Sequence, residues 1–122
     1  MGCDIHAHVD VDGEHFAQFD VTRDYTLFHG LAGVRSGQIE QVFPLRGLPS
    51  VISWGTKDSL EELAEDAHSV SWLTTEELHQ VFQKYVDKIG EKHDDIEAIL
   101  AAMGVLEKTN PQKVLFIFWF DN

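Results

Sequence analysis

Polar and apolar side chains alternate along the first residues of the chain, and the polar positions carry groups that bind metal ions. These positions are Asp4, His6, His8 and Asp10. An alternation with period two is typical of a half-buried β-strand, because successive side chains point to opposite faces. His6 and His8 would then point the same way, about 6–7 Å apart along the strand. We therefore predict a divalent metal site formed by His6 with Asp4, His8 or Asp10, and we prefer zinc because imidazole is a good ligand for it.

Further ligands could come from distant parts of the chain. His68 follows a predicted helix, Asp121 ends the last predicted strand, and His15 lies on the strand that returns from the first one. The alternative is an ordinary solvent-exposed sheet face, on which alternating polar residues are common. Cys3 falls on the opposite, apolar face, so we expect it to be a small buried side chain rather than a ligand or nucleophile.

Arg46 lies in a segment that contains prolines and glycines, and it allows two interpretations. Its guanidinium could hold an anionic group with two parallel hydrogen bonds. In a chain this acidic it could also pair with a carboxylate of the protein, and we favour that structural role narrowly. Nucleophilic catalysis has less support, because Ser69 and Ser71 lie near His68 without a Gly-x-Ser-x-Gly motif. The glycines around residue 33 also lack the spacing of a phosphate-binding loop.

The apolar pattern predicts the strands that must position these side chains. Asp12 and Gly13 form a two-residue hairpin signal between strands at 3–11 and 14–20. Residues 114–120 are apolar at nearly every position, which indicates a strand buried on both faces and therefore central in its sheet. Pairing of the first strand with the last would fix both ends of the chain.

Helical periodicity fills most of the sequence between these strands. Residues 36–57 are the exception: they form a long, aperiodic loop that carries Arg46 and Trp54, and long loops in compact domains are often functional. The predicted helices run from an Asp24 cap to Arg35, over a short stretch at 60–67, from a Thr74–Glu77 capping box to Gly90, and over 96–103 with Gly104 as the C-terminal cap.

These elements predict one α+β domain over residues 1–122. A small β-sheet combines the N-terminal hairpin with the C-terminal strand, and three to four helices cover it. The helices lie on one face and the long loop packs on the other. A chain of 122 residues with 43% hydrophobic residues is long enough and apolar enough to fill a single core.

The charge balance restricts the classes of partner. Nine Lys and Arg residues stand against 21 Asp and Glu residues, so the formal net charge is −12. A field of this sign repels nucleic-acid phosphates and anionic lipid, and it suits a bound cation or a basic protein. No run of residues approaches the roughly 20 apolar positions of a membrane span, and no apolar secretory core follows the N-terminus. One cysteine cannot form an internal disulfide, so we expect a cytoplasmic protein.

Several segments resemble a family of small uncharacterised proteins of bacteriophages and prophages. The match covers nearly the whole chain, and the family has no established activity, so the resemblance implies a phage origin and the host cytoplasm but no mechanism. The segments that carry it are MGCDIH at 1–6, YTLF at 25–28, LAGVR at 31–35, RGLP at 46–49, HSVSWL at 68–73 and FWFDN at 118–122.

Two hypotheses about function follow. Phages encode small acidic proteins that block host enzymes, including defence enzymes, so the first is a non-catalytic accessory protein that binds a basic surface of a host protein. The second is a metal-dependent hydrolase of a small or nucleotide-derived substrate, in which His6, His68 or Asp121 meets an ion near Arg46. We rank the first higher, because no known catalytic motif is present and the carboxylates repel anionic substrates.

Overall fold

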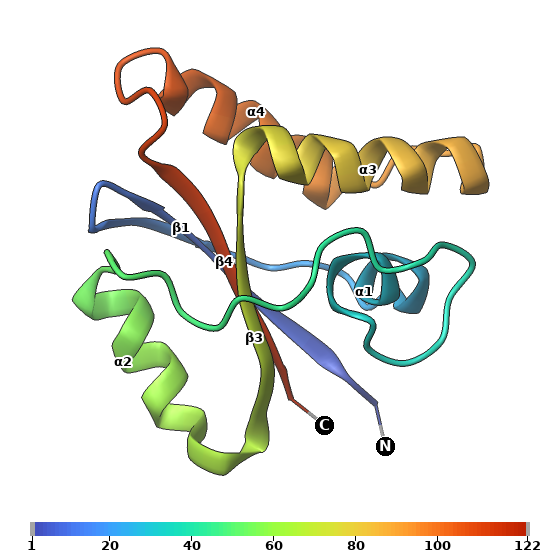
Figure 1. The fold of residues 1–122 in the computed structure, drawn as a ribbon, viewed down its shortest axis with the longest axis horizontal. Helices are drawn as coiled ribbons and strands as arrows, with labels where there is room; N and C mark the ends of the chain where they lie inside the picture. The colour runs from blue at the N-terminus through green and yellow to red at the C-terminus, as the bar shows by residue number, and fades with distance from the viewer. Residues whose placement is uncertain (1, 122) are drawn as a thin grey trace.

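The computed structural model describes residues 2–121, so the end residues Met1 and Asn122 of the two terminal motifs lie outside the described part. A four-stranded antiparallel sheet has the strand order β2-β1-β4-β3. Three helices lie on one side of the sheet, and a fourth helix and a long loop lie on the other (Figure 1). The α+β class predicted from the sequence is confirmed.

The N-terminal hairpin has the predicted turn. Strand β1 (Asp4–Val11) pairs with β2 (Glu14–Phe19). The two residues between them both have positive φ, 50° at Asp12 and 81° at Gly13. This is the backbone that a type I′ turn requires, and glycine adopts it without steric cost.

The last strand lies in the middle of the sheet, as its apolar sequence predicts. Strand β4 (Val114–Asp121) pairs with β1 along its whole length, from Val11 opposite Val114 to Asp4 opposite Asp121. Its alternate phenylalanines at 116, 118 and 120 are fully buried on the face that also holds Cys3, whose burial was predicted. The opposite face of β4 carries Ile117 and Trp119, which are buried as well.

The fourth strand was not predicted. Strand β3 (Ala67–Thr74) pairs with the free side of β4, and His68, which we placed just after a helix, lies on it opposite Phe120. The pairing is irregular between His68 and Ser71, and Ser69 has a φ of 57°. This irregularity breaks the period of two, so the sequence does not show the alternation typical of a strand.

The helices on the first face begin largely where their caps predict. Helix α1 (Tyr25–Ala32) has Asp24 as its N-cap, and α3 (Thr75–Ile89) has the Thr74–Glu77 capping box and ends at Gly90. Helix α4 (Asp94–Glu107) does not end at Gly104 as we predicted, but continues to Glu107. A lone glycine inside a helix costs only about 1 kcal/mol. The helix can therefore continue through Gly104 for three more residues.

The second face of the sheet is crossed by the long loop, as predicted, and is then covered by α2 (Trp54–Leu63) and the short 3-10 turn η1 (Ala64–Asp66). The loop starts its crossing at the β3 edge, where the backbone N–H of Gly47 donates to the carbonyl of Val70. It reaches β1 where the backbone N–H of Ser53 donates to Asp10. The loop therefore ends at Ser53, four residues earlier than predicted, because Ser53 caps α2 through the N–H of Thr56.

Candidate functional site

The polar face of β1 carries the four predicted ligands. The first two, Asp4 and His6, pair with different residues. Asp4 accepts two hydrogen bonds from Arg23, both 3.0 Å long, and these bonds hold the pKa of Asp4 below its usual value. His6 pairs through Nε2 with a carboxylate oxygen of Asp121, and both side chains are partly exposed. Strand β4 thus brings Asp121 next to His6, as predicted from the pairing of the first strand with the last.

Trp119 stacks against both His6 and His8. The indole ring lies parallel to both imidazoles, with centroid distances of 6.1 Å to His6 and 4.9 Å to His8. Trp119 and His8 are buried, and neither the indole Nε1 nor the His8 Nε2 has a hydrogen-bond partner within residues 2–121. The two histidines of the predicted site are therefore both stacked on the same aromatic ring.

His8 pairs instead with His15 of β2, which we had considered only as a further neighbour. The His8 Nδ1 lies 3.1 Å from the His15 Nε2. His8 is 1% exposed, whereas His15 is exposed to solvent. Burial, with a smaller contribution from the neighbouring His15, lowers the pKa of His8 to about 4, so its ring is neutral at physiological pH.

Asp10, the fourth predicted ligand, has a structural role. Its carboxylate is 1% exposed and accepts hydrogen bonds from the Ser53 N–H (2.6 Å), the Ser53 hydroxyl (2.8 Å) and the Thr56 hydroxyl (2.6 Å). Ser53 and Thr56 flank the start of α2, so Asp10 fixes the N-terminus of that helix on the sheet. The sequence does not predict either hydroxyl as a partner of Asp10, although serine is a preferred N-cap residue.

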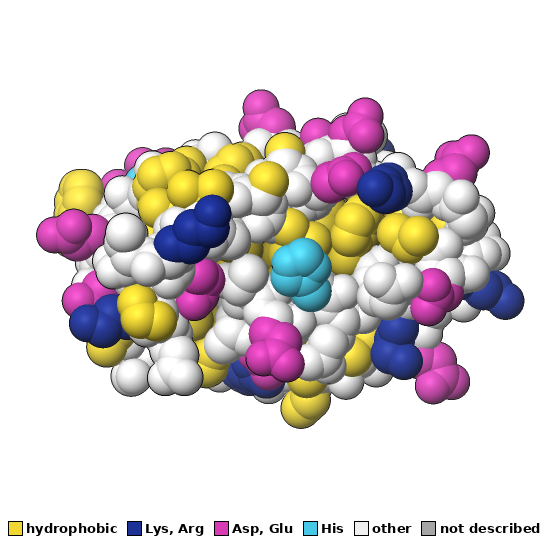
Figure 2. Space-filling model, turned by 90° about the horizontal axis from the view of Figure 1, so that it is seen from above, with side chains coloured by type: hydrophobic (Ala, Val, Ile, Leu, Met, Phe, Trp, Pro, Cys, Tyr) yellow, Lys and Arg dark blue, Asp and Glu magenta, His cyan; other side chains and the backbone are white. Residues whose placement is uncertain are grey.

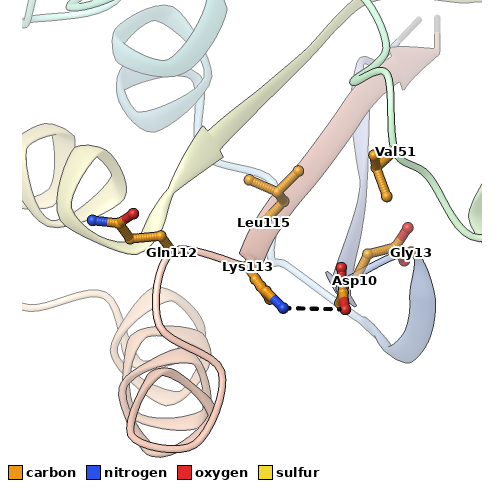
Figure 3. Close-up of a pocket in the computed structure, with 7 residues that line it drawn as sticks. Asp10, Gly13, Val51, Gln112, Lys113 and Leu115 are labelled. Atoms are coloured by element: carbon orange, nitrogen blue, oxygen red, sulfur yellow. Dashed lines mark ion pairs between the residues drawn. The ribbon is translucent and has the colours of Figure 1, made fainter.

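A small pocket of about 160 Å³ lies beside Asp10, between the hairpin turn and the start of β4. Figure 3 shows Asp10, Gly13 and Val51 on one side of it and Lys113 and Leu115 on the other. An ion pair of 3.5 Å joins Lys113 to the carboxylate of Asp12 across its mouth. The pocket is thus lined by charges that already have partners.

Arg46 lies away from the histidines and has the structural role that we favoured. Its guanidinium donates to both carboxylate oxygens of Glu77, at 2.7 and 2.5 Å, and to the carbonyl of Trp72. It also stacks over the Trp72 ring, 4.6 Å from the ring centroid. His68, for its part, lies against the Phe120 ring and contacts the Ser69 hydroxyl at 3.0 Å.

The predicted ligands Asp4, His6, His8 and Asp10 thus go to four separate partners. Across residues 2–121, no group of three or more His, Cys, Asp or Glu side chains is arranged to hold a metal ion. The structure joins two pairs within the histidine face: His6 with Asp121, and His8 with His15. From the sequence, His15 is only a possible further ligand, because it lies on the strand next to His8.

A second candidate surface consists of exposed apolar side chains of the long loop and of the first residue of α2. Trp54, the first residue of α2, is 79% exposed, although it is the largest apolar side chain of that segment. Leu45, Leu48 and Val51 precede it at intervals of three residues and are also exposed, between 37% and 56%. The length of the loop predicts a functional role, but only the structure shows which of its side chains face solvent.

No protein-family model, curated protein or solved structure matches the chain. None of the helices in residues 2–121 is long and apolar enough to cross a membrane.

Proposed function

We propose that this protein is a phage accessory protein that acts without catalysis, by binding a basic surface of a host protein in the host cytoplasm. Its binding surface is the outward face of α2 together with the exposed loop residues before it. The observation that carries the proposal is the 79% exposure of Trp54 at the edge of an acidic helix. The resemblance to phage proteins supports the choice of a host protein as the partner.

The exposed tryptophan is the natural anchor of such an interface. A large apolar side chain in water gains about 25 cal/mol for each Å² that a partner buries. Tryptophan is therefore among the residues that most often dominate binding energy in interfaces. Leu45, Leu48 and Val51 extend the apolar contact along the loop that leads to Trp54.

The charges around Trp54 define the partner. Positions 58, 61 and 62 follow Trp54 at helical intervals of four, seven and eight residues, so Asp58, Glu61 and Glu62 lie on the same side of α2. From residue 54 to residue 66 the chain has one lysine against five acidic residues. Helix α3, by contrast, has two lysines against three acidic residues, and Figure 2 shows both signs on the face that α3 and α4 form.

The placement of these charges costs α2 stability. The C-terminal end of a helix carries a partial negative charge, which favours cations and disfavours carboxylates. The last turn of α2 has no basic residue, and it carries Glu61 and Glu62. The C-cap Ala64 has a φ of 51°, which is unfavourable for a residue other than glycine. A helix that retains such features is consistent with a surface selected for binding.

The test compares variants of the untagged, immobilised protein in lysate of bacterial host cells. We expect the wild type to retain a basic protein at about 0.05 M salt and to lose it at about 0.5 M salt, because screening weakens exposed charge pairs. Trp54→Ala should lose the partner at both concentrations. Titration of the purified partner should also shift the Trp54 fluorescence to shorter wavelength as the ring leaves water.

Val105→Ala is the matched control, because Val105 is 63% exposed on α4, away from the proposed surface. It should retain the partner as the wild type does. Equal retention by Trp54→Ala and the wild type would contradict the proposal, as would a partner whose binding does not respond to salt.

The second candidate function is the metal-dependent hydrolase. The observation that favours it is the pairing of His6 with Asp121, because a carboxylate that orients an imidazole recurs in catalytic and metal-binding sites. Its test is a screen for phosphoester hydrolysis with added Zn²⁺ or Mn²⁺. Hydrolysis that is lost in His6→Ala, together with no salt-sensitive partner, would establish this function over the first.

A further inference from the structure

We propose that His8 and His15 form a two-histidine site for one divalent ion of a late transition metal, Cu²⁺ or Zn²⁺, on the N-terminal hairpin. The proposal does not depend on the proposed protein-binding function. Of the four ligands predicted on the first strand only His8 takes part, and the second ligand is His15, which the sequence predicts only as a possible further ligand.

The spacing of the two nitrogens fits a shared ion. Two nitrogens that each lie about 2.0–2.1 Å from a metal are about 2.9 Å apart at a right angle and about 3.4 Å apart at the tetrahedral angle. The observed distance between His8 Nδ1 and His15 Nε2 is 3.1 Å. The spacing therefore allows both nitrogens to contact one ion.

A bulge in the hairpin places His15 opposite the site. The β1–β2 register shifts between Val9 and Asp10, so that Ala17 pairs with Val9 but His15, not Phe16, pairs with Asp10. Without the extra residue, Phe16 would occupy the face that His8 shares. Bulges commonly re-aim a side chain in this way, and this one exchanges an apolar ring for a ligand.

His8 is held ready for coordination. Its ring stacks on Trp119 at 4.9 Å with an angle of 18° between the planes, and its backbone belongs to a central strand. The net charge of −12 attracts cations to the protein as a whole.

Binding of the ion to two neutral imidazoles releases no proton. In the apo protein one hydrogen lies between the two rings, and it belongs to one of them. When an ion takes its place, that hydrogen moves to the other nitrogen of the same ring, so two neutral rings release no proton. His15 is exposed, so water can accept a hydrogen bond from its Nδ1. Imidazole pairs suit Cu²⁺ and Zn²⁺, and Cu²⁺ binds more tightly in the usual order of stabilities.

The experiment titrates the untagged full-length protein with Cu²⁺ and, separately, with Zn²⁺ by calorimetry. We expect one ion per protein and quenching of the buried Trp119 emission by Cu²⁺, because Trp119 touches the His8 ring. The electron paramagnetic resonance spectrum of the Cu²⁺ form should show two imidazole nitrogens. His15→Gln, a change at an exposed position, should weaken Cu²⁺ binding at least tenfold and leave one nitrogen.

Two further variants keep the result specific. His79→Gln changes an exposed histidine on α3 and should bind Cu²⁺ as the wild type does. His6→Gln removes the other histidine that stacks on Trp119 and should also bind normally. The proposal is overturned if the wild type binds no ion, if His15→Gln binds as tightly as the wild type, or if His6→Gln loses the ion. No partner protein is involved, so this test and that of the proposed function can fail separately.

Discussion

His8 shows how one position on an alternating strand acquires properties that its neighbours lack. Its ring is buried against Trp119, while His6, two residues earlier, is partly exposed and pairs with a carboxylate. Burial without a charged partner favours the neutral imidazole, and this lowers the pKa of His8 from 6.5 to about 4. The folded state therefore binds fewer protons than the unfolded state between these two values.

The stability of the protein should consequently fall as the pH falls from about 6.5 towards about 4. Each unit of pH within this window is worth about 1.4 kcal/mol for one group, so we expect a loss of about 2 kcal/mol between pH 7 and pH 5. Urea denaturation at several pH values measures it. His8→Gln should flatten this dependence and His79→Gln should not; an equally steep dependence in His8→Gln would show that another group is responsible.

The Arg46–Glu77 pair gives a prediction at more acid pH. Hydrogen bonds from Arg46 are the main reason that the pKa of Glu77 is lowered from 4.5 to about 2. A lowered carboxyl pKa stabilises the fold above about pH 4.5, and this contribution is lost as the pH falls towards about 2. Arg46→Lys keeps the charge but loses the two-oxygen contact with Glu77 and the flat stacking on Trp72.

We expect Arg46→Lys to lower the free energy of unfolding by about 2 kcal/mol at neutral pH and to reduce the loss of stability below pH 4.5. Urea denaturation at neutral and acid pH measures both effects. Arg23→Lys is the control, because the Arg23–Asp4 pair is about half exposed and should contribute little. Equal effects of the two changes would mean that the buried contacts of Arg46 add nothing.

At the scale of elements, α2 is the helix whose sequence conflicts most with its own stability. Glu61 and Glu62 lie in its last turn, and hydrogen bonds from Ser53 and Thr56 to Asp10 fix its opposite end to the sheet. The same carboxylates are part of the proposed binding surface. Stability and binding should therefore respond to them in opposite directions.

The double variant Glu61→Gln/Glu62→Gln should raise the free energy of unfolding by about 0.3–1 kcal/mol for each change, because both charges oppose the helix dipole. It should also weaken retention of the basic partner at low salt. Thermal denaturation and the lysate experiment measure the two effects. The control Glu97→Gln removes a charge from the first turn of α4, where it is favourable, so it should lower stability and leave binding unchanged.

At the scale of the whole molecule, β4 connects everything else. It lies between β1 and β3 and buries aromatic side chains on both faces of the sheet. Truncation after Val114 should therefore abolish cooperative unfolding, as expected when the central strand is removed. Phe118→Ala, which deletes one buried ring, should cost about 3–5 kcal/mol and leave a cooperative transition. A truncated protein that still melts sharply would contradict this topology.

The sequence by itself determined the local elements. Asp12-Gly13, Asp24 and the Thr74–Glu77 box act through neighbouring backbone groups, so their patterns predict the turn and the helix starts directly. The apolar run at 114–120 likewise predicts a central strand. The alternation from Asp4 to Asp10 predicts which side chains share a face, because that depends only on the geometry of one strand.

Only the tertiary structure decided what those side chains do. Strand β3 exists because β4 offers it a partner, and its irregular register hides it from pattern analysis. Asp10 became a helix anchor because a loop from far along the chain brings Ser53 to it. His8 meets His15 because of a bulge, and its ring stacks on a tryptophan of the last strand. Contacts between residues far apart in sequence leave no local pattern. These contacts decide whether the polar face of a strand forms a binding site or only pairs with other parts of the protein.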